Sequence, residues 1–192
     1  SMEQTLMIDD RVIVNELVPK AVAVDHGDIV VFKDPGGWLP ARPPVEVTGI
    51  QAGTEWVLSL FGLASPDSND HLIKRVIGLP GDTVQCCSAD GKIMVNGVPI
   101  TEPYITIPAG ETRASAIDFN VTVPEGSLFV MGDNRYNSKD SRYNTDKPGG
   151  GFVGMDNVVG RAFVLSWPMS HWGWLSNYPE VFADVPEPAT SK

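Results

Sequence analysis

Three short stretches of the sequence carry polar residues that a simple strand or turn does not require: residues 1–6 (SMEQTL), 71–82 (HLIKRVIGLPGD) and 132–142 (GDNRYNSKDSR). In the second stretch, Lys74 and Arg75 interrupt an apolar strand pattern, and strand alternation places them on opposite faces. Unless the strand lies at the edge of a sheet, these two cations cannot both reach water, so at least one should be buried beside a partner. Burial lowers the pKa of a lysine, and its uncharged amine can act as a general base near neutral pH.

The stretch at 132–142 directly follows a predicted strand, SLFVM, and concentrates charged and amide side chains in one loop. A solvated turn is the usual interpretation of such a loop, and Asp140 with Arg142 could form a simple surface ion pair. In the first stretch, Ser1 precedes Met2, and a serine at that position is also a common remnant of an expression tag. Taken singly, each stretch is more often structural than catalytic.

The elements that must position these residues are mostly short strands. The Asn96-Gly97 pair between two apolar runs predicts a hairpin, and the inserted segment at 36–70 contains one predicted helix, at 53–64, with an apolar face. β-branched runs bounded by Gly, Asp, Pro and Asn predict strands in DRVIVNEL, GDIVVFKD, HLIKRVIGL, DTVQCC, GKIMVNGVPI, GSLFVMGD and VVGRAFVLSW. The predicted fold class is therefore mainly β with antiparallel sheets.

The composition argues against several other kinds of function. A net charge of −10 disfavours nucleic acid as a partner, and no run of eighteen apolar residues is present to span a bilayer. Without a CxxC or HExxH motif, and with only three histidines, we expect no metal and no cofactor. Neighbouring residues of a strand point to opposite faces, so we expect Cys86 and Cys87 to be free thiols, or one buried and one exposed.

Together, SMEQTL, DDRVIVNEL, GDIVVFKDP, IKRVIGLPGD and GDNRYNSKDSR follow the order of the sequence boxes of bacterial type I signal peptidases. The chain resembles this family over roughly residues 1–167, in the form found in Gram-positive bacteria, and KRVIGLPGD with GDNRxNSxDSR is the specific part. The resemblance implies a membrane-associated serine endopeptidase that removes signal peptides from exported pre-proteins, cutting after small residues (A-x-A). It also implies an open, barrel-like catalytic core at 1–84 and 126–178 and a small β cap at 85–125. The proline and acidic residues of 179–192 predict a flexible tail.

The resemblance assigns roles to individual residues. Ser1 occupies the register of the family nucleophile, Lys74 that of the general base, and Ser138 that of the serine whose hydroxyl holds the lysine amine. Two supporting ion pairs are implied, Arg75 with Asp133 and Asp140 with Arg142. Shallow pockets for small apolar side chains of the substrate would be lined by Met2, Leu6, Val12, Leu72 and Ile73.

The implied location is the extracytoplasmic face of the bacterial cytoplasmic membrane, with a single-pass anchor that lies outside this chain. The implied partners are signal peptides of secreted pre-proteins, the membrane surface and lipopeptide-type inhibitors, but no nucleic acid. We expect Trp167 to be buried and Trp172 and Trp174 to be either core residues or rings resting at the bilayer surface. Gln4 and Tyr136 depart from the family boxes, which usually have Pro and Asp there.

Three other interpretations stay open at this point. A self-cleaving Ser/Lys regulator of the repressor type shares the chemistry, although it normally carries a DNA-binding segment. A catalytically inactive module would bind signal peptides without cutting them. An N-terminal-nucleophile hydrolase would use the free amine of Ser1 as its base, and replacing Lys74 by Ala would leave that activity intact.

Overall fold

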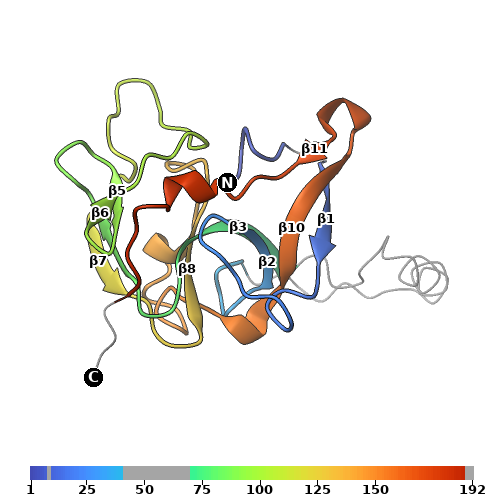
Figure 1. Ribbon diagram of the computed structural model, residues 1–192, viewed down its shortest axis with the longest axis horizontal. Coiled ribbons are helices and arrows are strands. Elements are labelled where there is room, and N and C mark those ends of the chain that lie inside the picture. Colours follow the sequence, from blue (N-terminus) through green and yellow to red (C-terminus); the bar gives the residue numbers. More distant parts are fainter. Residues whose placement is uncertain (8–9, 41–69, 189–192) are drawn as a thin grey trace.

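A computed structural model describes residues 1–7, 10–40 and 70–188 of the chain (Figure 1). The predicted helix at 53–64, and most of the inserted segment that contains it, lie outside these residues. The described elements are strands and single turns of 3-10 helix, so the prediction of a mainly β fold is confirmed. The 3-10 turns are η2 (Ser141–Tyr143), η3 (Met155–Asn157), η4 (Met169–His171) and η5 (Pro179–Val181).

The larger sheet has seven antiparallel strands in the order β1-β10-β2-β3-β8-β9, with β11 paired to β10. Among the described strands this sheet stays open, because β1 and β9 form its two ends. Its central strand β3 pairs with β2 through Val30 and Lys74 and with β8 through Val76 and Val130. The strands are β1 (Arg11–Asn15), β2 (Ile29–Lys33), β3 (His71–Gly78), β8 (Ser127–Met131), β9 (Val153–Gly154), β10 (Val158–Trp167) and β11 (Gly173–Trp174).

The smaller sheet has four antiparallel strands in the order β6-β5-β4-β7 and lies on the opposite side of the molecule from β1 and β10 (Figure 1). Asn96 and Gly97 join β5 to β6 with φ angles of 49° and 82°, which confirms the predicted hairpin turn with both central residues left-handed. The strands are β4 (Thr83–Cys86), β5 (Ile93–Val95), β6 (Val98–Pro99) and β7 (Phe119–Thr122). The division into a catalytic core and a cap stays a prediction.

A shared hydrophobic cluster joins the two sheets. Ile77 and Phe129 of the larger sheet pack in it with Val84 and Ile93 of the smaller one, and all four are at most 2% exposed. Burying such a side chain contributes about 1.5–3 kcal/mol relative to leaving it in water. The sheets therefore hold each other in place, and loops between them are attached to a fixed frame.

Two expectations about local structure differ from what is found. Cys86 and Cys87 are joined by a disulfide bond, and no cysteine is free, so the prediction of free thiols is wrong. That prediction placed both cysteines in one strand, whereas β4 ends at Cys86 and Cys87 lies beyond it, so strand alternation does not apply to the pair. The segment predicted as a flexible tail from residue 179 instead begins with η5, and Phe182 is buried in the shared cluster and stacks on His26.

Candidate active site

The centre of the larger sheet buries both cations that interrupt the apolar pattern of β3. Lys74 is 3% exposed and Arg75 is completely buried, because β3 is flanked by β2 and β8 rather than lying at an edge. The expectation that at least one of them is buried is confirmed. Each of the two must then find its own partner, since an unpaired buried charge costs several kcal/mol.

Lys74 meets the first residue of the chain. Its Nζ lies 2.7 Å from Ser1 Oγ and 3.1 Å from the carbonyl oxygen of Ile73. Burial lowers the pKa of Lys74, and the carboxylates of Asp140 and Asp133 only partly oppose this effect. A neutral amine in this position can accept the proton of the Ser1 hydroxyl, which is the condition for serine to act as a nucleophile.

Ser1 is held by the loop at 132–142 and by the residue that follows it. The backbone N–H of Asn134 donates to the carbonyl oxygen of Ser1 at 3.0 Å, and the Asn134 side chain donates to Glu3 at 2.9 Å. Met2 is 3% exposed and packs against Ile29. These contacts hold the backbone of Ser1 in place, although the residue itself is exposed to solvent.

Arg75 and Asp133 form a bidentate ion pair in which both side chains are completely buried. Arg75 Nε donates to Oδ1 at 2.9 Å and Nη2 donates to Oδ2 at 2.8 Å, while the hydroxyl of Thr5 donates to Oδ2 at 2.6 Å. The guanidinium also lies 3.9 Å from the centre of the Tyr104 ring. This pair fixes the start of the loop to β3, next to the strand position of Lys74.

Asp140 and Arg142 form a second bidentate pair within the same loop. Arg142 Nε donates to Oδ1 at 2.8 Å and Nη2 donates to Oδ2 at 2.7 Å, and both side chains are buried. The backbone N–H of Gly132 donates to Asp140 Oδ2 at 3.0 Å. The pair is therefore a buried ion pair within the loop, rather than the surface ion pair that its two-residue spacing also allows.

A third buried pair was missed from the sequence. Arg135 Nη1 donates to Glu102 Oε2 at 2.7 Å, and the hydroxyl of Tyr104 donates to Glu102 Oε1 at 2.9 Å. Burial by itself would lower the pKa of Arg135, but the Glu102 carboxylate outweighs it and raises that pKa. No local pattern links these residues, which lie 33 positions apart.

Ser138 is near the site but makes a different contact from the one implied. Its side chain is buried, yet Oγ has no hydrogen-bond partner among the residues that the structure describes, so no bond to the Lys74 amine is present. Oγ lies so close to Gly132 that a Cβ at that glycine would overlap it, and the same Cβ would lie 2.5 Å from the carbonyl oxygen of Ser1. The three residues are therefore packed together, with the hydroxyl turned toward Gly132.

Four of the five residues expected to line the substrate pockets gather in one small cluster. Met2, Leu6, Val12 and Ile73 pack there with Ile29 and Ala162 from β2 and β10. Leu72 lies elsewhere, against the separate cluster of Val30, Phe32 and Val76. The reason is strand alternation, since Leu72 and Ile73 are neighbours on β3 and point to opposite faces.

The tryptophan-rich segment at the end of β10 is largely exposed. Trp167 is 53% exposed, which contradicts the expectation that it is buried, because it ends β10 opposite Arg11 of the edge strand β1. Trp172 and Trp174 are 62% and 73% exposed, and Met169 is 80% exposed. These side chains are not part of the core.

Two further kinds of site are absent from the described residues. Across 1–7, 10–40 and 70–188, no cluster of three or more His, Cys, Asp or Glu side chains is arranged to hold a metal ion. Over the same ranges there is no helix with the length and apolar character needed to traverse a bilayer.

Comparison with known proteins points to one family. Residues 1–167 match the sequence model described as "Signal peptidase, peptidase S26". The chain is 39% identical over 197 residues to a probable signal peptidase I of Mycobacterium leprae, covering 90% of this chain and 68% of that protein. It is also 39% identical over 193 residues to signal peptidase I of Mycobacterium tuberculosis H37Rv, covering 90% of this chain and 64% of that protein.

A solved signal peptidase I from Enterococcus faecalis V583 is 29% identical, with a TM-score of 0.45, and the match covers 72% of this chain and 95% of that one. The chain spans about two thirds of the length of the mycobacterial relatives.

Proposed function

The chain belongs to the signal peptidase family, peptidase S26, whose members remove signal peptides from exported pre-proteins, and we propose that it does so with Ser1 as nucleophile and Lys74 as general base. The observation that supports these roles is the 2.7 Å separation of Lys74 Nζ and Ser1 Oγ in surroundings that lower the pKa of the amine. The two groups are within the range that proton transfer requires.

The reaction would proceed through an acyl-enzyme. Ser1 Oγ attacks the carbonyl carbon of the scissile peptide bond while Lys74 Nζ takes the hydroxyl proton. The C–N bond then breaks, the lysine ammonium returns the proton to the leaving amine, and the signal peptide stays attached to Ser1 as an ester. Lys74, neutral again, takes a proton from water as the water oxygen attacks the ester carbonyl. The C–Oγ bond then breaks, the lysine ammonium returns the proton to Ser1 Oγ, and the signal peptide leaves with a free carboxylate.

The supporting ion pairs keep the lysine neutral. The carboxylates of Asp133 and Asp140 raise the pKa of Lys74, which works against its role as a base. Arg75 and Arg142 each hold one of these carboxylates in two hydrogen bonds and so reduce its effect on the amine. Desolvation remains the larger influence, and the amine loses its proton at a pH below the usual value for lysine.

Ser138 has the role of a positioning residue in this proposal. An unpartnered buried hydroxyl costs about 1–3 kcal/mol, and the Ser138 Oγ is in that state. Rotation of the hydroxyl toward Lys74 would recover this free energy once substrate is bound, and it would hold the amine in line with Ser1.

The substrate would lie extended along the enzyme and gain main-chain hydrogen bonds. The cluster of Met2, Leu6, Val12 and Ile73 is apolar and offers contacts to small side chains such as alanine. The exposed rings of Trp172 and Trp174 suit contact with a bilayer surface, which fits a position on the extracytoplasmic face of the membrane. Lipopeptide-type acylating inhibitors would react at Ser1.

Cleavage of a peptide with an Ala-x-Ala site tests the proposal. Ser1→Ala and Lys74→Ala should both abolish turnover, whereas Lys147→Ala, at a partly exposed lysine paired with Asp146, should leave it unchanged. An acylating inhibitor should add its mass to Ser1 in the unchanged chain. Activity that survives Lys74→Ala would refute the Ser/Lys assignment and favour the amino group of Ser1 as base; binding of the peptide without cleavage would favour an inactive module.

A further inference from the structure

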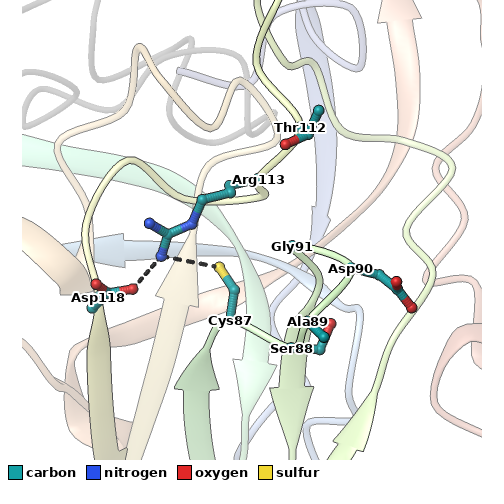
Figure 2. Close-up of a pocket in the computed structure, with 8 residues that line it drawn as sticks. All are labelled: Cys87, Ser88, Ala89, Asp90, Gly91, Thr112, Arg113 and Asp118. Atoms are coloured by element: carbon teal, nitrogen blue, oxygen red, sulfur yellow. Dashed lines mark hydrogen bonds and ion pairs between the residues drawn. The ribbon is translucent and has the colours of Figure 1, made fainter.

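The smaller sheet carries a reactive group that the proposed peptidase chemistry does not use. The disulfide between Cys86 and Cys87 lies at the end of β4, beside a cavity of about 520 Å³. Figure 2 shows the cavity and its lining residues, which are Cys87, Ser88, Ala89, Asp90, Gly91, Thr112, Arg113 and Asp118. None of these residues belongs to the candidate active site, so the inference below does not rest on the proposed function.

The two sulfur atoms are unequally accessible. Cys86 is 5% exposed and belongs to the shared hydrophobic cluster between the sheets. Cys87 is partly exposed and lines the cavity, which Cys86 does not. Thiol–disulfide exchange requires that the incoming thiolate reach one sulfur while the other leaves. The cavity offers that access to Cys87 Sγ alone.

The guanidinium of Arg113 contacts both sulfur atoms of the disulfide. Its Nη2 lies 3.8 Å from Cys86 Sγ and 3.7 Å from Cys87 Sγ. Figure 2 shows its contacts with Cys87 and Asp118. A positive neighbour lowers the pKa of a thiol and so stabilises its thiolate. A thiol of lower pKa is also the better leaving group in exchange. Arg113 is therefore placed to assist departure of Cys86.

We propose that this cavity is a thiol–disulfide exchange site that reacts with small thiols carrying a positively charged group. The thiolate of the incoming molecule attacks Cys87 Sγ, a new S–S bond forms there, and the Cys86–Cys87 bond breaks. The electron pair of the broken bond stays on Cys86 Sγ as a thiolate beside Arg113. A second thiol then attacks the sulfur of the first, which releases a small-molecule disulfide and leaves the protein with two thiols.

The charge of the lining residues selects the thiol. Asp90 and Asp118 contribute two negative charges and Arg113 one positive charge, so the cavity carries a net charge of −1. The whole chain, at −10, has the same sign. An ammonium group on the thiol is attracted by this field and a carboxylate is repelled, most strongly at low ionic strength.

The test follows the reaction by mass spectrometry under non-reducing conditions. The protein is mixed with cysteamine, 2-mercaptoethanol or mercaptoacetate at low salt, and free thiols are trapped with iodoacetamide at short times. We expect the trapped intermediate to carry the small thiol on Cys87 and the alkyl group on Cys86. Corrected for thiolate fraction, cysteamine should react about threefold or more faster than mercaptoacetate, with 2-mercaptoethanol between them and the difference shrinking at high salt.

Variants separate the contributions of the lining residues. Arg113→Gln should slow exchange about three- to tenfold, because the leaving thiolate loses its cation; Arg113→Lys should keep most of the rate. Arg11→Gln, at an exposed position of β1, changes the net charge equally and should have no such effect. Asp90→Asn should reduce the preference for cysteamine.

Four results would overturn the proposal: two free thiols in the protein before any thiol is added, a first adduct on Cys86, a faster reaction with mercaptoacetate than with cysteamine, or equal rates for Arg113→Gln and the unchanged chain.

Discussion

Replacing Asp133 by Asn removes one charge from a completely buried ion pair while keeping the shape of the side chain. Arg75 would retain hydrogen bonds to the carbonyl oxygens of Gly27 and Ser176, at 2.8 and 3.0 Å, and its contact with the Tyr104 ring. It would lose the carboxylate that accepts two of its hydrogen bonds, and the amide can accept from Arg75 through one oxygen instead of two. Breaking such a buried pair at one partner costs about 3–5 kcal/mol.

The loss is measured as the free energy of unfolding in urea, followed by tryptophan fluorescence. For a chain of this length each kcal/mol lowers the melting temperature by about 2–4 °C, so Asp133→Asn should melt about 6–20 °C lower. The matched control is Asp146→Asn, which makes the same chemical change in the surface pair with Lys147. That variant should lie within about 0.5 kcal/mol of the unchanged chain.

A second variant distinguishes lost packing from an uncompensated charge. Arg75→Met combined with Asp133→Asn leaves no charge at either position of this pair, so it should recover part of the stability that Asp133→Asn alone loses. Losses that simply add would refute the reasoning, as would a loss for Asp133→Asn below 1 kcal/mol or equal to that of the Asp146→Asn control.

Further outcomes follow from the same geometry. Lys74→Met should abolish turnover and raise the free energy of unfolding. Burial lowers the pKa of Lys74 in the folded chain, so the unfolded chain binds the proton more tightly. The gain in stability is therefore largest at low pH and shrinks as the pH rises toward the pKa of Lys74 in the unfolded chain. A gain that grows with pH contradicts this reasoning. Arg142→Gln leaves the buried carboxylate of Asp140 unpaired, and this carboxylate raises the pKa of Lys74. The increase of kcat/KM with pH should therefore move to higher pH. An unchanged dependence of kcat/KM on pH would exclude an effect of Asp140 on Lys74. Gly132→Ala should lower peptide cleavage at least tenfold, since its Cβ overlaps the site, whereas Gly154→Ala, with open space around it, should cleave normally.

The sequence predicted the structure best where the physical rule involves only residues that are neighbours in the chain. Alternation along β3 was enough to predict that Lys74 or Arg75 is buried, and the Asn96-Gly97 pair alone predicted its hairpin. The two-residue strands β9 and β11 were missed because so short a segment has no period to detect, and the four-residue strand β7 was missed as well.

Pairings between distant segments had no such signal. Glu102 and Arg135 meet only because the fold brings the end of the smaller sheet against the loop after β8. The Ser138 hydroxyl was assigned by analogy alone, and its orientation depends on the close approach of Gly132, which no sequence pattern encodes. Local rules therefore predicted most of the strands, and that a cation of β3 is buried, but not the contacts that orient the site.

Three buried ion pairs around one loop require an explanation, because apolar side chains of the same size often stabilise a fold as well or better. These pairs attach the loop to β3, to the segment after β6 and to itself, and they are Arg75–Asp133, Arg135–Glu102 and Arg142–Asp140. Apolar packing would also hold the loop, but it would not provide charged groups that bond backbone atoms, as Asp140 does at Gly132 N and Arg135 does at Gly132 O. Both the N–H and the carbonyl oxygen of Gly132 are thereby held by hydrogen bonds, at the place where this glycine lies close to Ser1 and Ser138. Because each carboxylate is matched by a guanidinium, this rigidity is achieved without a net charge that would keep Lys74 protonated.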